Sequence, residues 1–212
     1  MTDAITWNWP IIIQSFTGFA TVWIAYLALT SWRNQHKAEK VTFFLDELTD
    51  VIHEYIQLMN LPIQRLQFIK IHIDSHKFDI DLKKDLDFPE AIAFIEKDGK
   101  EESKSLLEAL TPCHKPLSKI RSLVVKGQVL SIKNYKECQD ACNMLSWQYD
   151  RLQAFYSIIS STNINWEHEK VKENLKNILK ITSEDIQQYL SNNQVAYLTF
   201  VKNTYDKVYK NS

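Results

Sequence analysis

A run of 23 residues without a charged side chain, from Pro10 to Trp32, constrains the fold of this chain more than any other feature. As an α-helix that rises 1.5 Å per residue, the run would be about 34 Å long, and the hydrocarbon core of a bilayer is about 30 Å thick. Its apolar side chains contribute roughly −3 to −5 kcal/mol to membrane insertion, and tryptophans stand at both ends, at Trp7, Trp9 and Trp32. The run therefore predicts a transmembrane helix over residues 10–32.

A cleaved signal peptide and a buried core helix are the alternatives to this anchor. A signal peptide carries basic residues before its apolar run, whereas the only charged residue before this run is Asp3. A signal peptide also ends in small residues, whereas this run ends in Trp32 and Arg33. A core helix seldom has so many uncharged residues in succession. We therefore expect a retained anchor.

The basic residues near this run predict its orientation. Arg33, Lys37 and Lys40 follow the run, and no lysine or arginine precedes it. Because basic residues concentrate on the cytoplasmic side, residues 1–9 are expected to form a short outward-facing tail and the residues after Arg33 to be cytoplasmic. The odd number of cysteines, three, fits a reducing compartment. The predicted localisation is a bacterial inner membrane, with a single pass and the lipid bilayer as a partner.

Small residues recur on one side of the predicted anchor. Thr17, Thr21, Ala25 and Ala28 follow one another at intervals of four, four and three residues. Faces of small residues let two helices approach closely, and Gln14 could form a hydrogen bond across such a pair. Self-association of the chain through this face is therefore a further expectation.

The rest of the chain is predicted to be all-α. The whole sequence contains only three glycines, and Asp98-Gly99 is its single Asn-Gly or Asp-Gly turn signal. Long segments with few turns favour helices, and short connections make neighbouring helices antiparallel. The expected organisation is a juxtamembrane stalk helix over 33–61 and a cytoplasmic helical bundle with coiled-coil-like packing over 62–212. A net charge of −1 gives no basic surface for a nucleic acid.

Apolar residues mark the expected helices. The stalk is expected to end at Leu61-Pro62, because proline disfavours helix in the residue before it. Residues 62–82 fit either a helix or a hairpin, and a helix is favoured because a lone hairpin is marginal in water. Six apolar residues in the stalk repeat at alternating intervals of three and four. They are Val41, Phe44, Leu48, Val51, Tyr55 and Leu58.

Further helices are expected from Pro89 to Gly99, over 101–110, over 117–126, from Ser131 onward, over 166–180, and from Thr182 or Ser183 to near the end. The helix that Ser131 is expected to cap has the longest apolar seam in this part of the chain, with intervals of three and four over three heptads. The residues of this seam are Tyr135, Cys138, Cys142, Leu145, Tyr149, Leu152, Tyr156 and Ile159.

His72 and His76 are the best candidates for metal ligands. On a helix, residues four apart lie on one side, and this spacing can bind zinc. However, the metalloprotease pattern requires a glutamate directly after the first histidine, where this chain has Ile73. Asp74 and Asp79 could complete a site, although aspartates in such loops are usually solvated. We therefore expect no metal here.

Other reactive residues are also expected to have structural roles. Cys138 and Cys142 lie in the apolar seam, where a free cysteine acts as a small hydrophobic residue. His53-Glu54 and Glu167-His168-Glu169 place acids beside imidazoles, but adjacent residues of a helix do not face each other. No phosphate-binding glycine loop or nucleophile motif is present. We expect no catalytic and no cofactor-binding residue.

Trp32-Arg33-Asn34-Gln35, followed by Lys37 and a helix with an apolar seam, resembles a loose set of small uncharacterised bacterial single-pass membrane proteins. In these proteins an N-terminal transmembrane helix leads into a W-R-x-Q turn and then a helix that ends near a proline, as at Pro62. The resemblance covers about the first 60 residues, and His36 stands where an aliphatic residue is expected. It implies an inner-membrane setting and no particular activity.

The sequence thus predicts a membrane-anchored helical protein without catalytic activity, which acts as a scaffold or regulator by binding another protein or itself. One alternative is a membrane-acting effector of a stress or phage-defence system, with Gln14, Thr17 and Thr21 on an association face. A second alternative is a metal-binding protein or enzyme that uses His72 and His76.

Overall fold

The computed structural model describes residues 9–78 and 87–210, with side chains described for residues 17–77 and 87–208. Within these residues every regular element is a helix, as the sequence predicted. The tail predicted over residues 1–9 lies, apart from its last residue, outside the described part of the chain, and so do residues 79–82 of the segment that fitted either a helix or a hairpin.

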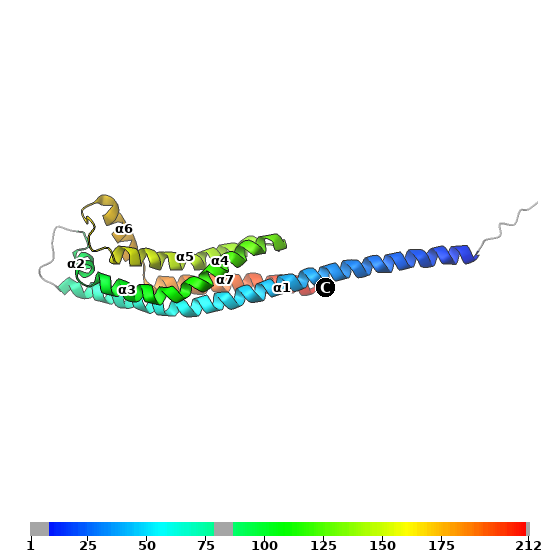
Figure 1. Ribbon diagram of the computed structural model, residues 1–212, viewed down its shortest axis with the longest axis horizontal. Helices are drawn as coiled ribbons and strands as arrows, with labels where there is room; N and C mark the ends of the chain where they lie inside the picture. The colour runs from blue at the N-terminus through cyan, green and yellow to red at the C-terminus, as the bar shows by residue number, and fades with distance from the viewer. Residues whose placement is uncertain (1–8, 79–86, 211–212) are drawn as a thin grey trace, which may run out of the picture.

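One helix, α1 (Trp9–Ser75), runs the length of the molecule and is about 100 Å long (Figure 1). Its N-terminal part projects alone, and the remainder packs in the bundle. The other helices follow in chain order. They are η1 (His76–Phe78), α2 (Pro89–Lys97), α3 (Gly99–Leu110), η2 (Thr111–Cys113), α4 (His114–Gly127), η3 (Gln128–Leu130), α5 (Tyr135–Ile159), α6 (Glu169–Leu179) and α7 (Ser183–Lys210).

The predicted break at Pro62 is wrong, because α1 continues through this residue. Proline within a helix costs about 3 kcal/mol. Here the fully buried Met59 and Leu66 lie one turn to either side, and each buried side chain of this size contributes roughly 1.5–3 kcal/mol. Packing therefore outweighs the proline. The same continuity makes residues 62–75 helical and places no turn at Trp32–Gln35.

The seams predicted from the sequence face the core. Along α1, Val41 and Tyr55 mark the ends of a buried row that packs against α4 and α7. Residues 41–59 of the helix predicted over 33–61 therefore pack in the bundle. In α5, Cys138, Leu145 and Ile159 are among the buried seam residues, and α5 packs most extensively against α7.

The helix starts were predicted less well than the seams. The backbone N–H of Asp185 donates to Thr182 Oγ1 (3.1 Å) at the start of α7, as expected. By contrast, α5 is preceded by Asn134 in the left-handed conformation (φ 61°), and Ser131 lies in the loop before it.

Within the described residues, no helix combines the length and the apolar character needed to cross a membrane. The transmembrane helix predicted over 10–32 is therefore wrong for this part of the chain. Residues 17–32 would span only about 24 Å as a helix, include Thr17, Thr21 and Thr30, and lead directly into Arg33. The side chains of residues 9–16, on which the prediction also depended, lie outside the described part.

The predictions that depended on the transmembrane helix are corrected with it. The single-pass topology, the outward-facing N-terminus and the localisation of the residues after Arg33 in a bacterial inner membrane all depended on the predicted span. None of these expectations is supported by a described helix.

Candidate functional site

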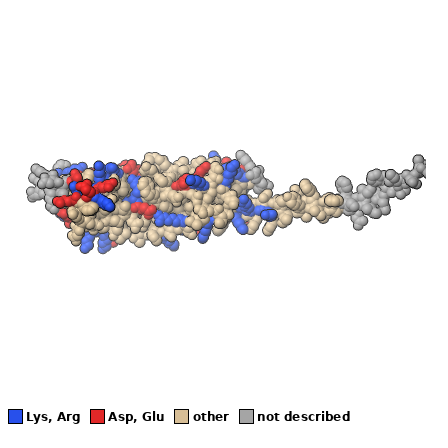
Figure 2. All heavy atoms as spheres, turned by 90° about the horizontal axis from the view of Figure 1, so that it is seen from above, with Lys and Arg blue, Asp and Glu red and all other residues tan. Residues whose placement is uncertain are grey.

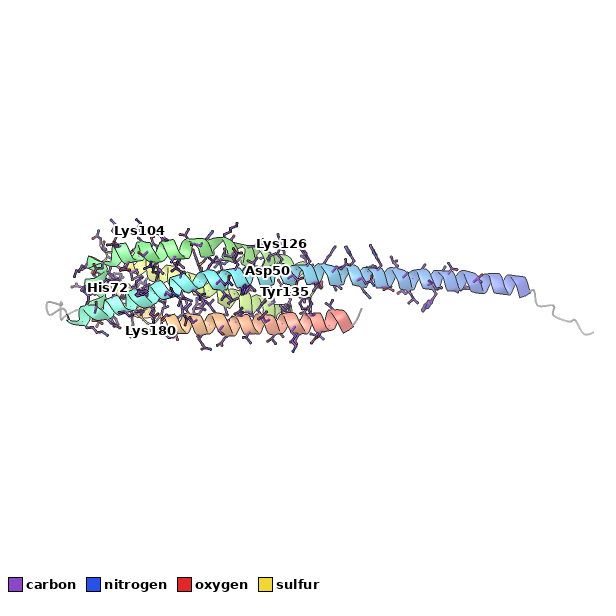
Figure 3. The ribbon with its side chains drawn as sticks, turned by 90° about the horizontal axis from the view of Figure 1, so that it is seen from below. Asp50, His72, Lys104, Lys126, Tyr135 and Lys180 are labelled. Carbon is purple, nitrogen blue, oxygen red and sulfur yellow. The ribbon has the colours of Figure 1, made fainter. Side chains whose placement is uncertain are left out.

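Within the described residues, two features are unusual for a helical bundle. One is the histidine cluster, which consists of His72, His76, Asp98 and Glu102. The other is the projecting segment, residues 17–32 of α1. They lie at opposite ends of the molecule, as the position of His72 in Figure 3 shows.

The two histidines of the cluster come from the end of α1. His72 lies in the last turn of α1, and His76 is the first residue of η1. Their ring centroids are 6.0 Å apart, so the helical spacing does bring them together. Phe94 of α2, which is fully buried, lies 5.5 Å from the ring of His72 and 6.0 Å from the ring of His76. His76 itself is only 6% exposed.

The two acids of the cluster come from the corner between α2 and α3. Asp98 makes no side-chain hydrogen bond to cap α3, and its Oδ2 lies 3.3 Å from Nε2 of His76. Glu102 Oε1 lies 3.5 Å from Nδ1 of His72. The backbone N–H of Glu102 also donates to the carbonyl oxygen of Asp98 (3.1 Å), which fixes the two acids relative to each other.

Gly99 allows the corner between α2 and α3 to lie against the end of α5. A Cβ atom at Gly99 would overlap the backbone carbonyl oxygen of Ile159, at the end of α5. Only glycine allows the α2–α3 corner to pack this closely on α5, and the close packing in turn holds Asp98 beside the histidines.

One ligand atom from each of His72, His76 and Asp98 can be chosen so that all three lie within 4.8 Å of one another. The sequence indicated the histidine pair but not its acidic partner. Asp74 pairs with Lys77 instead (2.8 Å), and Asp79 lies outside the described residues. Asp98 is 22 residues from His76, and only its Asp-Gly turn signal drew attention to it.

The three cysteines are buried in the core, as expected for Cys138 and Cys142. Burial raises the pKa of the Cys113 thiol to about 11, and its Sγ contacts the carbonyl oxygen of Ala109 (3.9 Å). The pKa of Cys142 is also raised, first by its hydrogen bond with Cys138 and then by burial. The thiolate is the nucleophile and the metal ligand, so the raised pKa values of Cys113 and Cys142 and the burial of all three cysteines favour a core-filling role.

In His53-Glu54 and Glu167-His168-Glu169, the imidazoles contact groups other than the adjacent acids. His53 Nε2 lies 2.8 Å from the side-chain nitrogen of Gln57 on the surface of α1. His168 Nδ1 accepts a hydrogen bond from the backbone N–H of Lys170 (3.3 Å) and so caps α6. The sequence did not predict this capping role.

The projecting segment is apolar and exposed. Figure 2 shows no acidic or basic side chain on this part of the molecule, whereas both signs are mixed over the bundle. The hydroxyl of Thr21 donates to the carbonyl oxygen of Thr17 (2.8 Å), and that of Thr30 to Tyr26 (3.0 Å), so these polar groups are satisfied within the helix. Eight large apolar side chains are between 49% and 79% exposed. They are Phe19, Val22, Trp23, Ile24, Tyr26, Leu27, Leu29 and Trp32.

Exposed polar and charged residues from Arg33 to Lys40 separate the projecting segment from the adjacent end of the bundle, where two partly apolar hollows lie. A hollow of about 280 Å³ lies where α1 enters the bundle, and Val41, Leu130, Ile132 and Val208 contribute apolar side chains to its lining. A second hollow beside it includes the exposed side chain of Val129. Charged side chains, among them Lys37, Lys207 and Lys126, also line these hollows, so the uncharged surface is confined to the projecting segment.

Comparisons with protein families, curated proteins and solved structures found no match for this chain. The resemblance to small bacterial membrane proteins therefore stays a prediction.

Proposed function

We propose that this chain is a non-enzymatic helical interaction protein that associates with a second copy of itself through the projecting segment. The observation that carries the proposal is the exposure of eight large apolar side chains on one uncharged stretch of helix. Monomeric proteins rarely expose contiguous apolar patches of more than a few hundred Å², and larger patches mark interaction sites.

The exposed apolar area, summed around the whole helix, is comparable with the area that a stable interface buries. A fully exposed aromatic side chain presents about 150–250 Å², so the four partly exposed aromatic residues of the segment together expose on the order of 500 Å². Four aliphatic side chains add to this area. A standard interface buries about 800 Å² on each partner. A second copy presents the same area, and an interface between two identical patches is the commonest kind in homo-oligomers.

The spacing of the large side chains indicates which face pairs. Phe19, Val22, Tyr26 and Leu29 follow one another at intervals of three, four and three, the a/d pattern of a coiled coil. Of the small residues predicted to mediate association, Thr17, Thr21 and Ala28 lie on the other side of the helix, and Ala25 flanks the seam. In water, association is driven by the apolar area buried, at about 25 cal/mol per Å². The face with large side chains is therefore the stronger candidate.

Sedimentation equilibrium of the full chain tests the proposal. We expect the wild-type chain to associate reversibly at micromolar concentrations. Val22→Asp places a charge in the seam and should shift the chain to monomer. Ala28→Ser is the matched control on the opposite face, and it should leave the association unchanged.

Two results would overturn the proposal. One is a wild-type chain that is monomeric throughout the concentration range. The other is a chain that floats with phosphatidylglycerol vesicles and shows no association in their absence, which is the behaviour predicted by the alternative of a membrane-acting effector.

A further inference from the structure

We propose that His72, His76 and Asp98, with Glu102 as the fourth ligand, bind one divalent transition-metal cation of the Zn²⁺ type. The bound cation would join the end of α1 to the corner between α2 and α3. This site is independent of the projecting segment, because it lies at the other end of the bundle (Figure 3).

Two distances in the cluster match the spacing of neighbouring ligands around a tetrahedral metal. With metal–ligand bonds of about 2.0–2.1 Å, neighbouring ligand atoms lie about 3.3 Å apart. His76 Nε2 and Asp98 Oδ2 are 3.3 Å apart, and His72 Nδ1 and Glu102 Oε1 are 3.5 Å apart. The ligand atoms of His72, His76 and Asp98 also converge to within 4.8 Å. His76 is held by burial, so closing the site requires movement of the side chains of His72, Asp98 and Glu102, which are 29–44% exposed. Glu102 has the farthest to move, because its ligand atom lies outside the converging group of three.

The donor set selects the class of metal. Two imidazoles with two carboxylates suit zinc and similar divalent transition metals. Magnesium and calcium prefer sites made only of oxygen ligands, and copper(I) prefers sulfur. The chemistry of this site therefore points to Zn²⁺.

Two separate histidine–carboxylate hydrogen bonds are the simpler explanation of the same contacts. They do not account for the convergence of His72 on His76 and Asp98, because the two contacts join different acids and yet the ligand atoms of these three residues lie within 4.8 Å of one another. A single cation would use this convergence, since it contacts both imidazoles and both carboxylates at once.

The surroundings hold the site in place. Phe94 packs against both imidazole rings and restricts their orientation. Asp98 is held by the corner that Gly99 allows to pack on α5. Ligands fixed by their neighbours in this way lose little entropy when a metal binds.

Isothermal titration of the metal-stripped full chain with zinc chloride tests this inference. We expect one zinc ion per chain, and a rise in Tm of roughly 5–10 °C at zinc concentrations 100-fold above the Kd. Asp98→Asn keeps the shape of the side chain but removes its charge, and His72→Gln changes an exposed ligand. Each should weaken zinc binding at least tenfold, with the helical circular dichroism unchanged.

His53→Gln is the matched control, because His53 is exposed on α1 outside the cluster. It should bind zinc as the wild-type chain does. The inference is overturned if the chain shows no saturable binding, or if Asp98→Asn and His72→Gln bind zinc as tightly as the wild-type chain. It is also overturned if His53→Gln weakens binding as much as they do, since binding would then be adventitious.

Discussion

The hydroxyl of Tyr197 in α7 lies 2.9 Å from the hydroxyl of Thr49 in α1, and both hydroxyls are within hydrogen-bond distance of the carbonyl oxygen of Leu45. Three oxygens thus share two protons at the contact between these helices. Tyr197 is fully buried, so its hydroxyl depends on these partners. This small network joins the first and last helices of the bundle.

A double-mutant cycle at this network should reveal coupling between α1 and α7. Tyr197→Phe and Thr49→Val are each expected to lower the free energy of unfolding by about 1 kcal/mol, because each removes a buried hydrogen bond. The double variant should lose less than the sum of the two single losses, by at least about 0.5 kcal/mol. Urea unfolding measures all four free energies. Strict additivity would show that the two hydroxyls do not interact.

Stability should fall in alkaline solution. Burial raises the pKa of Tyr55 and of Tyr197 above the ordinary value of 10.0. A raised pKa contributes stability that is fully present below pH 10 and is lost as the pH rises toward the folded-state pKa. Each tyrosine should therefore reduce the free energy of unfolding by about 1.4 kcal/mol per pH unit above 10.

Urea unfolding at pH 9, 10 and 11 checks this prediction. Tyr55→Phe should make the decline above pH 10 shallower by the contribution of one tyrosine, although it also removes the hydrogen bond to the carbonyl oxygen of Leu145 (3.0 Å). A free energy of unfolding that is constant from pH 9 to 11 would contradict it.

Gly127 should not tolerate a side chain. A Cβ atom there would overlap the hydroxyl of Tyr135 and the ring of Phe44. Because this region is closely packed, Gly127→Ala is expected to destabilise the chain by about 1–3 kcal/mol. Gly18→Ala is the matched control, since no atom lies within 4 Å of its added Cβ, and alanine is the better helix former. Equal Tm values for Gly127→Ala and the wild-type chain would contradict the packing described here.

The features that were predicted correctly from the sequence are those that local periodicity determines. The buried rows of α1 and α5 follow from apolar residues repeated every three or four positions, which a helix brings to one side. The helix from Pro89 was also predicted from local signals, its initial proline and the glycine that follows it.

The features that were missed depend on tertiary contacts. Pro62 signals a break, but packing on both sides of it keeps α1 continuous. Asp98 reaches His76 only because α2 folds back against the end of α1. Apolar composition alone suggested a transmembrane helix over 10–32. It could not distinguish a helix that crosses a membrane from one that exposes the same side chains at the end of a bundle.

The central claim is that a second copy of the chain covers the projecting segment. The most direct test is thiol labelling of a cysteine placed in the row of Phe19, Val22, Tyr26 and Leu29. The native cysteines are buried, so a single new cysteine reports on its own position. At micromolar protein concentration, Val22→Cys should react with a maleimide at least tenfold more slowly than Ala28→Cys on the opposite face, and dilution should abolish the difference. Equal labelling rates at every concentration would contradict the account.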